Sequence, residues 1–414
     1  MRTGPRFKYV VVLPDGVADR PIKALGNRTP LEVAKHPNMD WIASNGITGW
    51  AKTIPDGFPP GSDVGCMSVF GYDPRTHYSG RAPLEAAAQG IELGDRDVVF
   101  RCNTVTVENG VMVDYSAGHI ESAESHELIK AVDAALGGNG LRFYPGVSYR
   151  HLAVVDCGLW TVDARELVQT KCTPPHDISG KPIEPHLPQG AADERLRALM
   201  VDSAGVLKEH PVNRRRIQEG KRPATQVWFW GQGTRAQFAS FRETYGLRGA
   251  CISAVDIVRG LGRLVGFDII KVPGITGYFD TNYRGKAGYA LKALDDHDLV
   301  LVHIEPTDEA GHMGDPHKKI QAIEDTDRLV VGTLLEGLKR RQEPFAIMVV
   351  CDHPTSTALK THLPEPVPFA IYATGGPTDE VSAYTEVAVG RSMKRFDEGF
   401  RLMSFFLGLG KGSR

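Results

Sequence analysis

Long apolar runs near the two ends of the chain are the clearest pattern in the sequence, and they predict its core. Four such runs cover residues 9–13, 299–304, 345–351 and 367–372. Strands without polar alternation are typical of parallel sheets that are covered on both faces. Helical spacing of apolar residues appears between them, for example over residues 30–45, where Pro37 should interrupt the helix. The two ends of the chain therefore predict one α/β core, a doubly wound, mostly parallel sheet.

The pattern changes in the middle of the chain, where short segments alternate between apolar and polar residues. Residues 98–100 and 104–107 are typical β segments, and Asn109-Gly110 provides a two-residue hairpin turn. Residues 172–190 are rich in Pro, His and Gly and predict an ordered loop. We therefore predict a smaller α+β domain that interrupts the core. The predicted core comprises residues 1–78 and 248–414, and the predicted inserted domain comprises residues 79–247.

Composition excludes several classes of function. The formal net charge is −2 over 414 residues, so we expect no broad surface for nucleic acids or anionic membranes. No apolar run approaches the roughly 18 residues of a transmembrane helix, and the N-terminal residues lack the apolar segment of a signal peptide. The six cysteines are scattered without a CxxC pair, which favours reduced thiols. We expect a cytoplasmic protein, whose oligomeric state the sequence leaves open.

The segment Pro59–Phe70 carries the first candidate chemistry. Two prolines and a glycine stop regular structure, and the apolar spacing after Ser62 predicts a short buried helix. A serine at a helix start can cap the first turn, and the same position can hold a phosphoryl group. A serine hydroxyl is a poor nucleophile unless a base or a metal ion activates it. Ser62 is therefore either a capping residue or a candidate nucleophile.

Carboxylates and imidazoles follow the ends of the predicted strands. Six of them stand at or just past these ends: Asp15, Asp308, His312, Asp352, His353 and His362. Asp308 and His312 are four residues apart, which one helical turn brings onto the same face. Mixed carboxylate and imidazole ligands suit Mn²⁺, Zn²⁺, Co²⁺ or Fe²⁺, and Mg²⁺ less well. Two such ions about 4 Å apart can clamp a phosphoryl group during its transfer.

These motifs resemble the alkaline phosphatase superfamily and, within it, the cofactor-independent phosphoglycerate mutases of the archaeal type. The resemblance runs nearly end to end and rests on Pro14-Asp15-Gly16, Pro60-Gly61-Ser62-Asp63, Asp308-x-x-x-His312, Asp352-His353 and Thr361-His362. It implies two divalent ions, usually Mn²⁺, with Mg²⁺, Co²⁺ or Zn²⁺ in some members. It implies that Asp15, Ser62, Asp352 and His353 hold one ion, and that Asp308, His312 and His362 hold the other. Ser62 would be the nucleophile that moves a phosphoryl group between 3-phosphoglycerate and 2-phosphoglycerate.

The same resemblance implies substrate contacts for a small phosphorylated carboxylic acid. His119, Arg150 and Lys286 stand at phosphate- and carboxylate-binding positions of the family. His151 follows Arg150, where the longer bacterial type of mutase carries an acidic residue, and is a further candidate. Arginine and lysine suit such a substrate, because it carries about three negative charges.

Other interpretations remain open at this point. Asp114–Ile120, Tyr149–His151 and His210–Asn213 also resemble a bacterial branch of the family that has been proposed to act as homoserine kinase. The segment Gly231–Ala236 fits the GxGxxA dinucleotide fingerprint, although no P-loop is present. We favour the mutase, because a kinase needs a purine site that no segment clearly offers.

Two further alternatives concern the cationic residues and catalysis itself. Asn213–Arg216 together with Lys221-Arg222 form a local basic cluster, which is either a solvated helix face or a ligand surface. A metal-stabilised binding protein on the same fold would bind ions without turnover.

Overall fold

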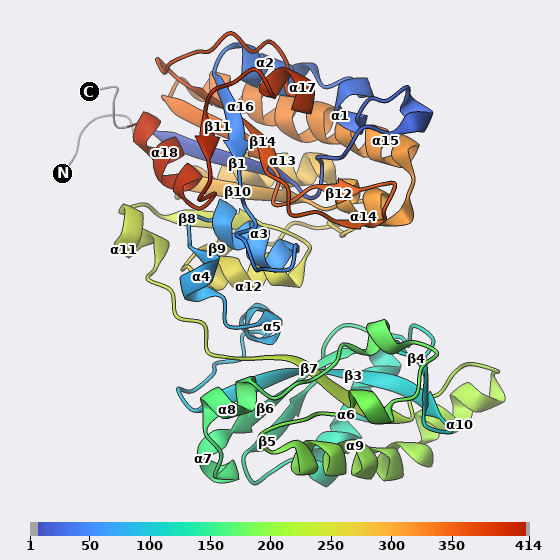
Figure 1. Cartoon of the computed structure of the whole chain (residues 1–414). Coiled ribbons are helices and arrows are strands. Elements are labelled where there is room, and N and C mark those ends of the chain that lie inside the picture. Colours follow the sequence, from blue (N-terminus) through green and yellow to red (C-terminus); the bar gives the residue numbers. More distant parts are fainter. Residues whose placement is uncertain (1–6, 411–414) are drawn as a thin grey trace. The chain divides into compact units, whose positions relative to one another are not determined.

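Strand β1 (Lys8–Pro14) lies in the middle of an eight-stranded sheet and is buried along its whole length. It pairs in parallel with β10 (Leu299–Ile304) on one side and with β11 (Phe345–Val350) on the other. These three strands are apolar runs from the two ends of the chain. The computed structural model, which describes residues 7–410, therefore confirms the predicted doubly wound α/β core (Figure 1). The prediction that the chain lacks a signal peptide used the N-terminal residues, and residues 1–6 lie outside the described part of the chain.

The core sheet has the strand order β15-β2-β14-β11-β1-β10-β8-β9. Its other strands are β2 (Ile47–Ala51), β8 (Gly249–Ile252), β9 (Asp268–Ile269), β14 (Val367–Ala373) and β15 (Arg395–Phe396). Strand β14 runs antiparallel to both of its neighbours, β11 and β2. Because β1, β10 and β11 run in parallel, their carboxyl ends meet at one edge of the sheet.

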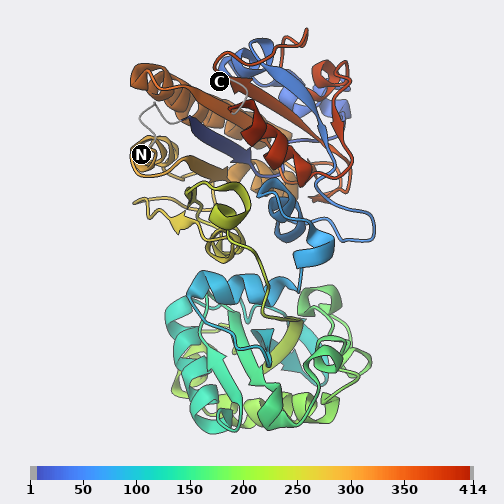
Figure 2. The same cartoon turned by 90° about the vertical axis from the view of Figure 1, so that its left-hand side faces the viewer.

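Helices cover both faces of this sheet (Figure 2). One group consists of α2 (Pro37–Ser44), α13 (Tyr283–Ala293), the π-helical turn η4 (Asp327–Val331) and α16 (Gly332–Arg341). The other group consists of α3 (Ser62–Val69), α12 (Asp256–Leu264) and α18 (Arg401–Leu409). The remaining elements of this unit are η1 (Lys23–Leu25), α1 (Pro30–Val33), α4 (Pro74–His77), α11 (Phe241–Tyr245), α14 (Pro306–Met313), α15 (Pro316–Thr326), β12 (Thr355–Ser356), β13 (Thr361–His362) and α17 (Glu386–Val389).

The helix predicted over residues 30–45 is interrupted as expected. It consists of α1 and α2, and Pro37 is the first residue of α2. Thr29 caps α1 in a reciprocal capping box with Glu32. Proline is accepted at a helix start, because the N–H that it lacks would have no partner there.

The second unit covers Ser79–Ala236, and the core unit resumes at Gln237. The sequence places this boundary at residue 247. The segment after Ala236 packs with the core unit, since Tyr72 donates a hydrogen bond to the carbonyl of Ala239 at 2.8 Å and Phe241 packs against Phe267.

An antiparallel sheet organises the second unit. Its strands are β3 (Asp97–Glu108), β4 (Val111–Asp114), β5 (Leu141–Tyr144), β6 (Arg150–Asp156) and β7 (Gln226–Thr234). The long strand β3 pairs with β6 on one side and with β7 on the other, and the end of β3 pairs with β4. Asn109 and Gly110 both have positive φ and form the β3–β4 turn, as the sequence predicts.

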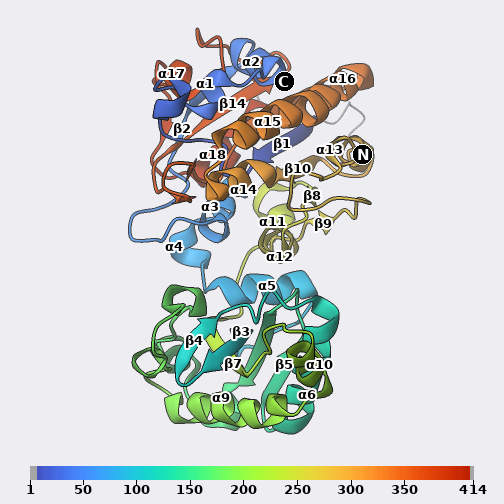
Figure 3. The same ribbon diagram turned by 90° about the vertical axis from the view of Figure 1, so that its right-hand side faces the viewer.

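The two faces of this second sheet differ. Helices α6 (Ser122–Leu136) and α9 (Asp193–Lys208) bury one face in a core that includes Phe100 (Figure 3). On the opposite face α5 (Arg81–Gln89) packs through Ala82 and Ala86 on Val99. The remaining elements are α7 (Cys157–Trp160), α8 (Ala164–Val168), η2 (Pro175–Ile178), η3 (Glu184–His186) and α10 (Pro211–Gln218). The predicted loop at 172–190 contains the short turns η2 and η3.

Candidate metal centre

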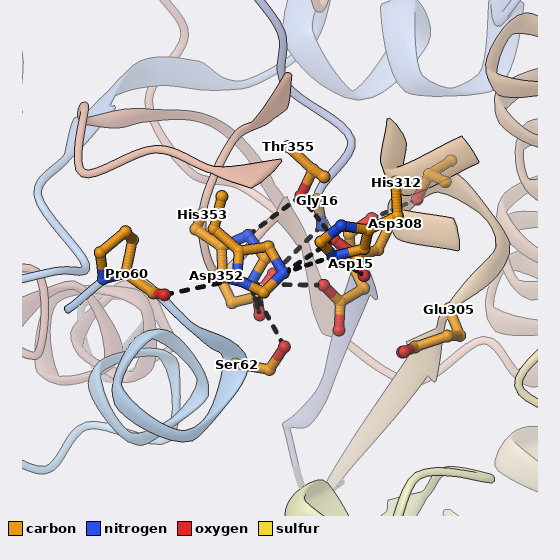
Figure 4. A network of polar contacts seen from close by, with 12 residues as sticks. Asp15, Gly16, Pro60, Ser62, Glu305, Asp308, His312, Asp352, His353 and Thr355 are labelled. Carbon is orange, nitrogen blue, oxygen red and sulfur yellow. Dashed lines mark hydrogen bonds and ion pairs between the residues drawn. The ribbon is translucent and has the colours of Figure 1, made fainter. Parts of the chain in front are cut away.

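The loops after β1, β10 and β11 bring the predicted carboxylates and imidazoles together at one edge of the core sheet (Figure 4). Asp15 directly follows β1, Asp352 and His353 follow β11, and Asp308 lies in α14 after β10. All four side chains are buried. The parallel register causes this convergence, since Pro14 at the end of β1 pairs with the last residue of β10.

Asp15, Asp352 and His353 form the first ligand group, with ligand atoms within 4.8 Å of one another. His353 Nε2 lies 3.1 Å from Asp352 Oδ2 and 3.7 Å from Asp15 Oδ1. Ser62 Oγ lies 3.2 Å from the same nitrogen. The structure therefore brings together the four residues that the resemblance assigns to one ion.

Ser62 is the first residue of α3, and Gly61 occupies the N-cap position. The capping interpretation of Ser62 is therefore wrong, because its hydroxyl faces His353 instead of the backbone of its own helix. Gly65 allows the helix to lie close to the ligand loop, since a Cβ atom there would stand 2.3 Å from the carbonyl oxygen of Asp352. The start of α3 thus presents Ser62 to the first ligand group.

The second group, as the resemblance assigns it, consists of Asp308, His312 and His362, and His353 also forms a possible metal group with Asp308 and His362. His312 Nε2 lies 3.3 Å from Asp308 Oδ2, and His362 Nε2 lies 3.4 Å from Asp308 Oδ1. The two Nε2 atoms are 2.8 Å apart. Asp308 and His312 are one turn apart in α14, as the sequence predicts, whereas His362 comes from strand β13. His353 stands between the groups, since its ring lies 4.1 Å from that of His362.

The electrostatics of this centre fit divalent ions. Burial and the nearby charge of Asp352 raise the pKa of Asp15 well above its usual value. Burial also opposes ionisation of Asp308, but hydrogen bonds from His312 and His362 hold its pKa well below the usual range. Asp15 Oδ1 is buried and has no hydrogen-bond partner among the described residues. A bound cation would compensate these clustered carboxylates, and their oxygens together with imidazole nitrogens suit a transition-metal ion.

Sequence reasoning missed His303 and Glu305, which form a third possible metal group with Asp15. His303 Nε2 lies 2.7 Å from Asp15 Oδ2. Burial, with the charge of Lys286, lowers the pKa of His303 to about 3, and burial raises that of Glu305 well above its usual value. The available signals were a histidine inside an apolar strand and an acidic residue at the strand end.

Lys286 lies in α13 and is fully buried. Its Nζ donates a hydrogen bond to the carbonyl oxygen of His303 at 2.8 Å, and burial lowers its pKa to about 8. The structure thus places Lys286 behind the β10 end of the metal centre. Its contact with substrate stays a prediction.

The other three predicted substrate residues belong to the second unit. His119 and Arg150 are exposed, and Arg150 lies over the ring of Tyr149 at 5.4 Å. The His151 ring is 1% exposed, and its Nδ1 accepts a hydrogen bond from the Gly146 N–H at 3.0 Å. Burial, together with a nearby histidine, lowers the pKa of His151 to about 3. Substrate binding by these residues stays a prediction.

The partly covered face of the second sheet carries a group of residues that sequence reasoning did not connect. Arg101 and Asn103 alternate along β3 and share one face, and the register places Trp230 opposite Arg101 and Arg150 opposite Asn103. The guanidinium of Arg101 stacks on the Trp230 indole at 4.1 Å, and the indole N–H donates to Asn103 at 3.0 Å. We call Arg101, Asn103, Arg150 and Trp230 the open sheet face.

The charge of the open sheet face favours an anion. Arg101 is 6% exposed, and its Nε donates to Glu85 at 3.0 Å. Burial lowers the pKa of Arg101; Glu85 opposes this effect, while the charges of Arg81 and Arg150 add to it. The Glu85 carboxylate lies within 4.0 Å of the Arg101 and Arg81 guanidinium groups, and Arg150 adds a further positive charge near Arg101. Arginine forms paired hydrogen bonds to carboxylates and phosphates, so this surplus of positive charge suits an acidic ligand.

The segment Asp114–Ile120, which is shared with the kinase-proposed branch, is held by α10, the helix that begins within the shared segment His210–Asn213. Arg216 of α10 is buried and donates to the carbonyl of Ala117 at 2.8 Å, while also pairing with Glu124 of α6. Asp114 accepts hydrogen bonds from the N–H groups of Ser116 and Gly118. These contacts hold the turn before His119, in which Ala117 and His119 have positive φ. The basic cluster is therefore not simply a solvated helix face, because its Asn213 and Arg216 side chains are buried.

The dinucleotide interpretation of Gly231–Ala236 is wrong. Residues 231–234 belong to β7, and no helix begins in the described chain between there and Phe241. Gly233 is needed for close packing, since a Cβ atom there would stand 1.8 Å from the carbonyl oxygen of Ser79.

Comparison with known proteins identifies the family. A model of the family described as 2,3-bisphosphoglycerate-independent phosphoglycerate mutase matches residues 43–213. A protein with this name from Methanosarcina mazei is 51% identical over 384 residues, which cover 92% of this chain and 95% of the relative. The chain belongs to this family. A mutase of the same name from Methanothrix thermoacetophila is 50% identical, over 97% of this chain and 100% of the relative.

A solved structure supports the same assignment. The cofactor-independent phosphoglycerate mutase from Thermoplasma acidophilum matches with a TM-score of 0.67 and 29% identity, covering 98% of this chain and 100% of that one. Family membership confirms the resemblance predicted from the sequence, and the relatives favour the mutase over the homoserine kinase alternative. Among the described residues of this mutase-family chain, no helix is both long and apolar enough to span a bilayer.

Proposed function

We propose that this chain interconverts 3-phosphoglycerate and 2-phosphoglycerate without 2,3-bisphosphoglycerate, by carrying the phosphoryl group on Ser62. One observation carries the proposal: the Ser62 hydroxyl lies 3.2 Å from His353 Nε2, where Asp15 and Asp352 converge. The names of relatives about half identical to this chain supply the reaction. A serine with no capping contact, aimed at a cluster of metal-type ligands, is the arrangement that an activated nucleophile requires.

The metal centre would hold two divalent ions. We assign Asp15, Ser62, Asp352 and His353 to one ion and Asp308, His312 and His362 to the other. Mn²⁺ is the metal we expect, with Mg²⁺, Co²⁺ and Zn²⁺ as alternatives. Such ions supply positive charge for the phosphoryl oxygens and lower the pKa of a bound hydroxyl.

The transfer on Ser62 has two balanced halves. In the first, a bond forms between Ser62 Oγ and phosphorus while the bond from phosphorus to the 3-oxygen of the substrate breaks. The proton that leaves Ser62 balances the proton that the departing oxygen takes up. In the second half a bond forms between the 2-oxygen of the same glycerate and phosphorus while the bond from phosphorus to Ser62 Oγ breaks, and the proton lost by the 2-hydroxyl balances the proton that Ser62 regains. Glycerate must stay bound between the halves, so recognition of its carboxylate matters as much as the chemistry.

We place recognition of the acid on cationic residues. Arg101 and Arg150 of the open sheet face are the principal candidates, with His119 beside them in the same unit. Their surplus of positive charge supports binding of an anion, and Trp230 keeps the Arg101 guanidinium in one plane. His151 and Lys286 are further candidates for substrate contact, and the buried side chain of each also bonds to the neighbouring backbone.

We also propose that the protein works in the cytoplasm. All six cysteines are free thiols, and five of them are buried. Unpaired thiols are typical of a reducing compartment.

The test runs two reactions on one preparation of the full chain. Phosphorus NMR should show conversion of 3-phosphoglycerate to 2-phosphoglycerate in the presence of Mn²⁺ and in the absence of 2,3-bisphosphoglycerate. The same preparation with ATP and homoserine should form no phosphohomoserine. ATP-dependent phosphorylation of homoserine with negligible mutase turnover would overturn the proposal in favour of the kinase. Tight Mn²⁺ binding without either reaction would favour a binding protein.

A further inference from the structure

Thr355 touches both ligand groups and was assigned to neither. It lies in β12, directly after the loop that carries Asp352 and His353, and its side chain is buried. Its Oγ1 lies 2.5 Å from Asp308 Oδ1 and 3.2 Å from His353 Nδ1 (Figure 4). One hydroxyl therefore links a carboxylate of the second group to an imidazole of the first.

The directions of these two hydrogen bonds follow from the donors available. A carboxylate that serves as a metal ligand only accepts, so the single hydroxyl proton of Thr355 points to Asp308. Thr355 Oγ1 then accepts from His353 Nδ1, which must carry the ring proton. His353 Nε2, on the opposite side of the ring, keeps its lone pair toward Asp15, Asp352 and Ser62. Outer contacts of this kind fix the tautomer and orientation of metal-binding histidines.

Lys319 of α15 holds Thr355 from behind. Its ammonium group is fully buried and donates to three oxygens: the Thr355 carbonyl at 2.6 Å, the Ala18 carbonyl at 3.1 Å and Asp19 Oδ2 at 3.2 Å. These acceptors lie on the loops after β11 and β1. The Thr355 N–H also donates to the Ala18 carbonyl at 3.1 Å. A buried ammonium with all three donors paired is costly to disturb, so it ties the two ligand loops together.

The packing leaves Thr355 little room to move. A Cβ atom on Gly16 would stand 2.2 Å from Thr355 Oγ1, and one on Gly311 would stand 2.6 Å from Thr355 Cγ2. Gly16 also has a φ of 57°, which favours glycine. The loop after β1 and the last turn of α14 thus close around this threonine from two sides.

We propose that Thr355, held in place by Lys319, is a positioning residue that couples the two metal-ion sites. It orients His353 for the first ion and Asp308 for the second, so an ion that orders either ligand also orders the other. Loss of the hydroxyl weakens both sites and removes the coupling between them. The inference rests on the proposed function only in requiring ions at these two groups, and it holds whichever phosphoryl transfer the centre performs.

The test measures Mn²⁺ binding to the full chain, by calorimetry and by the electron paramagnetic resonance of free and bound Mn²⁺. Thr355→Val keeps the shape of the side chain and removes the hydroxyl, whereas Thr355→Ser keeps the hydroxyl. Thr374→Val is the matched control, because the Thr374 hydroxyl bonds only to the backbone of Phe345, at the opposite end of β11. Circular dichroism checks that each variant is folded.

We expect two Mn²⁺ ions to bind cooperatively to the parent chain, to Thr355→Ser and to Thr374→Val. Thr355→Val should bind both ions about 10- to 100-fold more weakly and without cooperativity. Lys319→Met should weaken both sites in the same way. If Lys319→Met does not fold, the comparison of valine with serine at position 355 decides alone. Two cooperative sites of parental affinity in folded Thr355→Val would overturn the inference, as would the absence of Mn²⁺ binding by the parent chain. If two Mn²⁺ ions bind cooperatively but the chain shows no mutase turnover, the proposed function is wrong and the inference about Thr355 still holds.

Discussion

The metal centre and the open sheet face differ in the kinds of residue that form them and in the sign of their charge. The metal centre gathers buried carboxylates and imidazoles from the ends of neighbouring parallel strands. The open sheet face gathers two arginines, an asparagine and an indole from three antiparallel strands. Negative charge accumulates in the first and positive charge in the second. Taken each within its own unit, the first region suits bound cations and the second suits an anion.

The largest effect should come from the nucleophile. We expect Ser62→Ala to lower kcat at least about 10⁴-fold, because among the described residues only Ser62 places a hydroxyl beside His353 Nε2, where Asp15 and Asp352 converge. Ser68→Ala is a matched control in the same helix, since the Ser68 hydroxyl donates to the carbonyl of Thr53 and faces away from the ligands. It should retain kcat and lose about 1 kcal/mol of stability. Steady-state kinetics of both variants provide the measurement, and normal turnover by Ser62→Ala would rule out the assignment.

Removal of the metal ions should lower turnover nearly as much as Ser62→Ala does. Its effect on stability should be confined to the core unit. We expect exhaustive chelation to abolish turnover and to lower the unfolding temperature, because bound ions stabilise the folded state and compensate the clustered carboxylates. Added Mn²⁺ should restore both properties at two ions per chain. Elemental analysis and thermal unfolding on one sample are the measurements. Full turnover by a metal-free sample would contradict the account.

The open sheet face should give an intermediate effect of a different kind. We expect Arg101→Met to lower kcat/KM about 30-fold to several thousand-fold, which corresponds to about 2–5 kcal/mol for one partner of a buried charge pair. Mn²⁺ binding should remain unchanged, because Arg101 belongs to the second unit. Arg195→Met is the control, since Arg195 stacks on Trp160 of the same unit. Equal kinetics for the two variants would remove the open sheet face from substrate recognition.

The smallest effect is expected for His151, and it concerns how the free energy of unfolding depends on pH. Its folded pKa of about 3 lies below the value of 6.5 for a free histidine, so the unfolded chain binds more protons between these values. The contribution of the neutral His151 ring to the free energy of unfolding is therefore complete above pH 6.5, and it falls as the pH decreases toward 3. Between pH 7.5 and pH 5 we expect the parent chain to lose about 2 kcal/mol relative to His151→Asn. Urea unfolding at the two pH values measures this difference, and parallel pH profiles would show that the ring is not held neutral.

The two regions also differ in how far the sequence predicts them. The convergence of the candidate ligands Asp15, Asp308, Asp352 and His353 could be predicted, because they follow apolar runs and parallel strands carry their ends to one edge. The proximity of Asp308 and His312 could be predicted from their spacing of one helical turn alone. His303 was missed because a histidine within an apolar strand is usually a core residue, and its contact with Asp15 depends on the register of β1 against β10.

The open sheet face could not be assembled from the sequence. Arg101 meets Trp230 only through the pairing of β3 with β7, which joins positions more than a hundred residues apart. Its other partner, Glu85, reaches it from a helix packed on the sheet. The alternation of Arg101 and Asn103 within an otherwise apolar strand was the one local signal. For Ser62 the local sequence predicted the place at the helix start, but it left open whether the hydroxyl caps the helix or faces the ligands.

Direct detection of a phosphoryl group on Ser62 tests the central claim most directly. The full chain with Mn²⁺ and 3-phosphoglycerate labelled with ³²P at phosphorus is quenched during turnover, digested and mapped by mass spectrometry. The account predicts label on the peptide that contains Ser62, and none when Ser62→Ala is treated in the same way. Turnover with the label on another residue, or with no labelled peptide at any quench time, would contradict transfer through this serine.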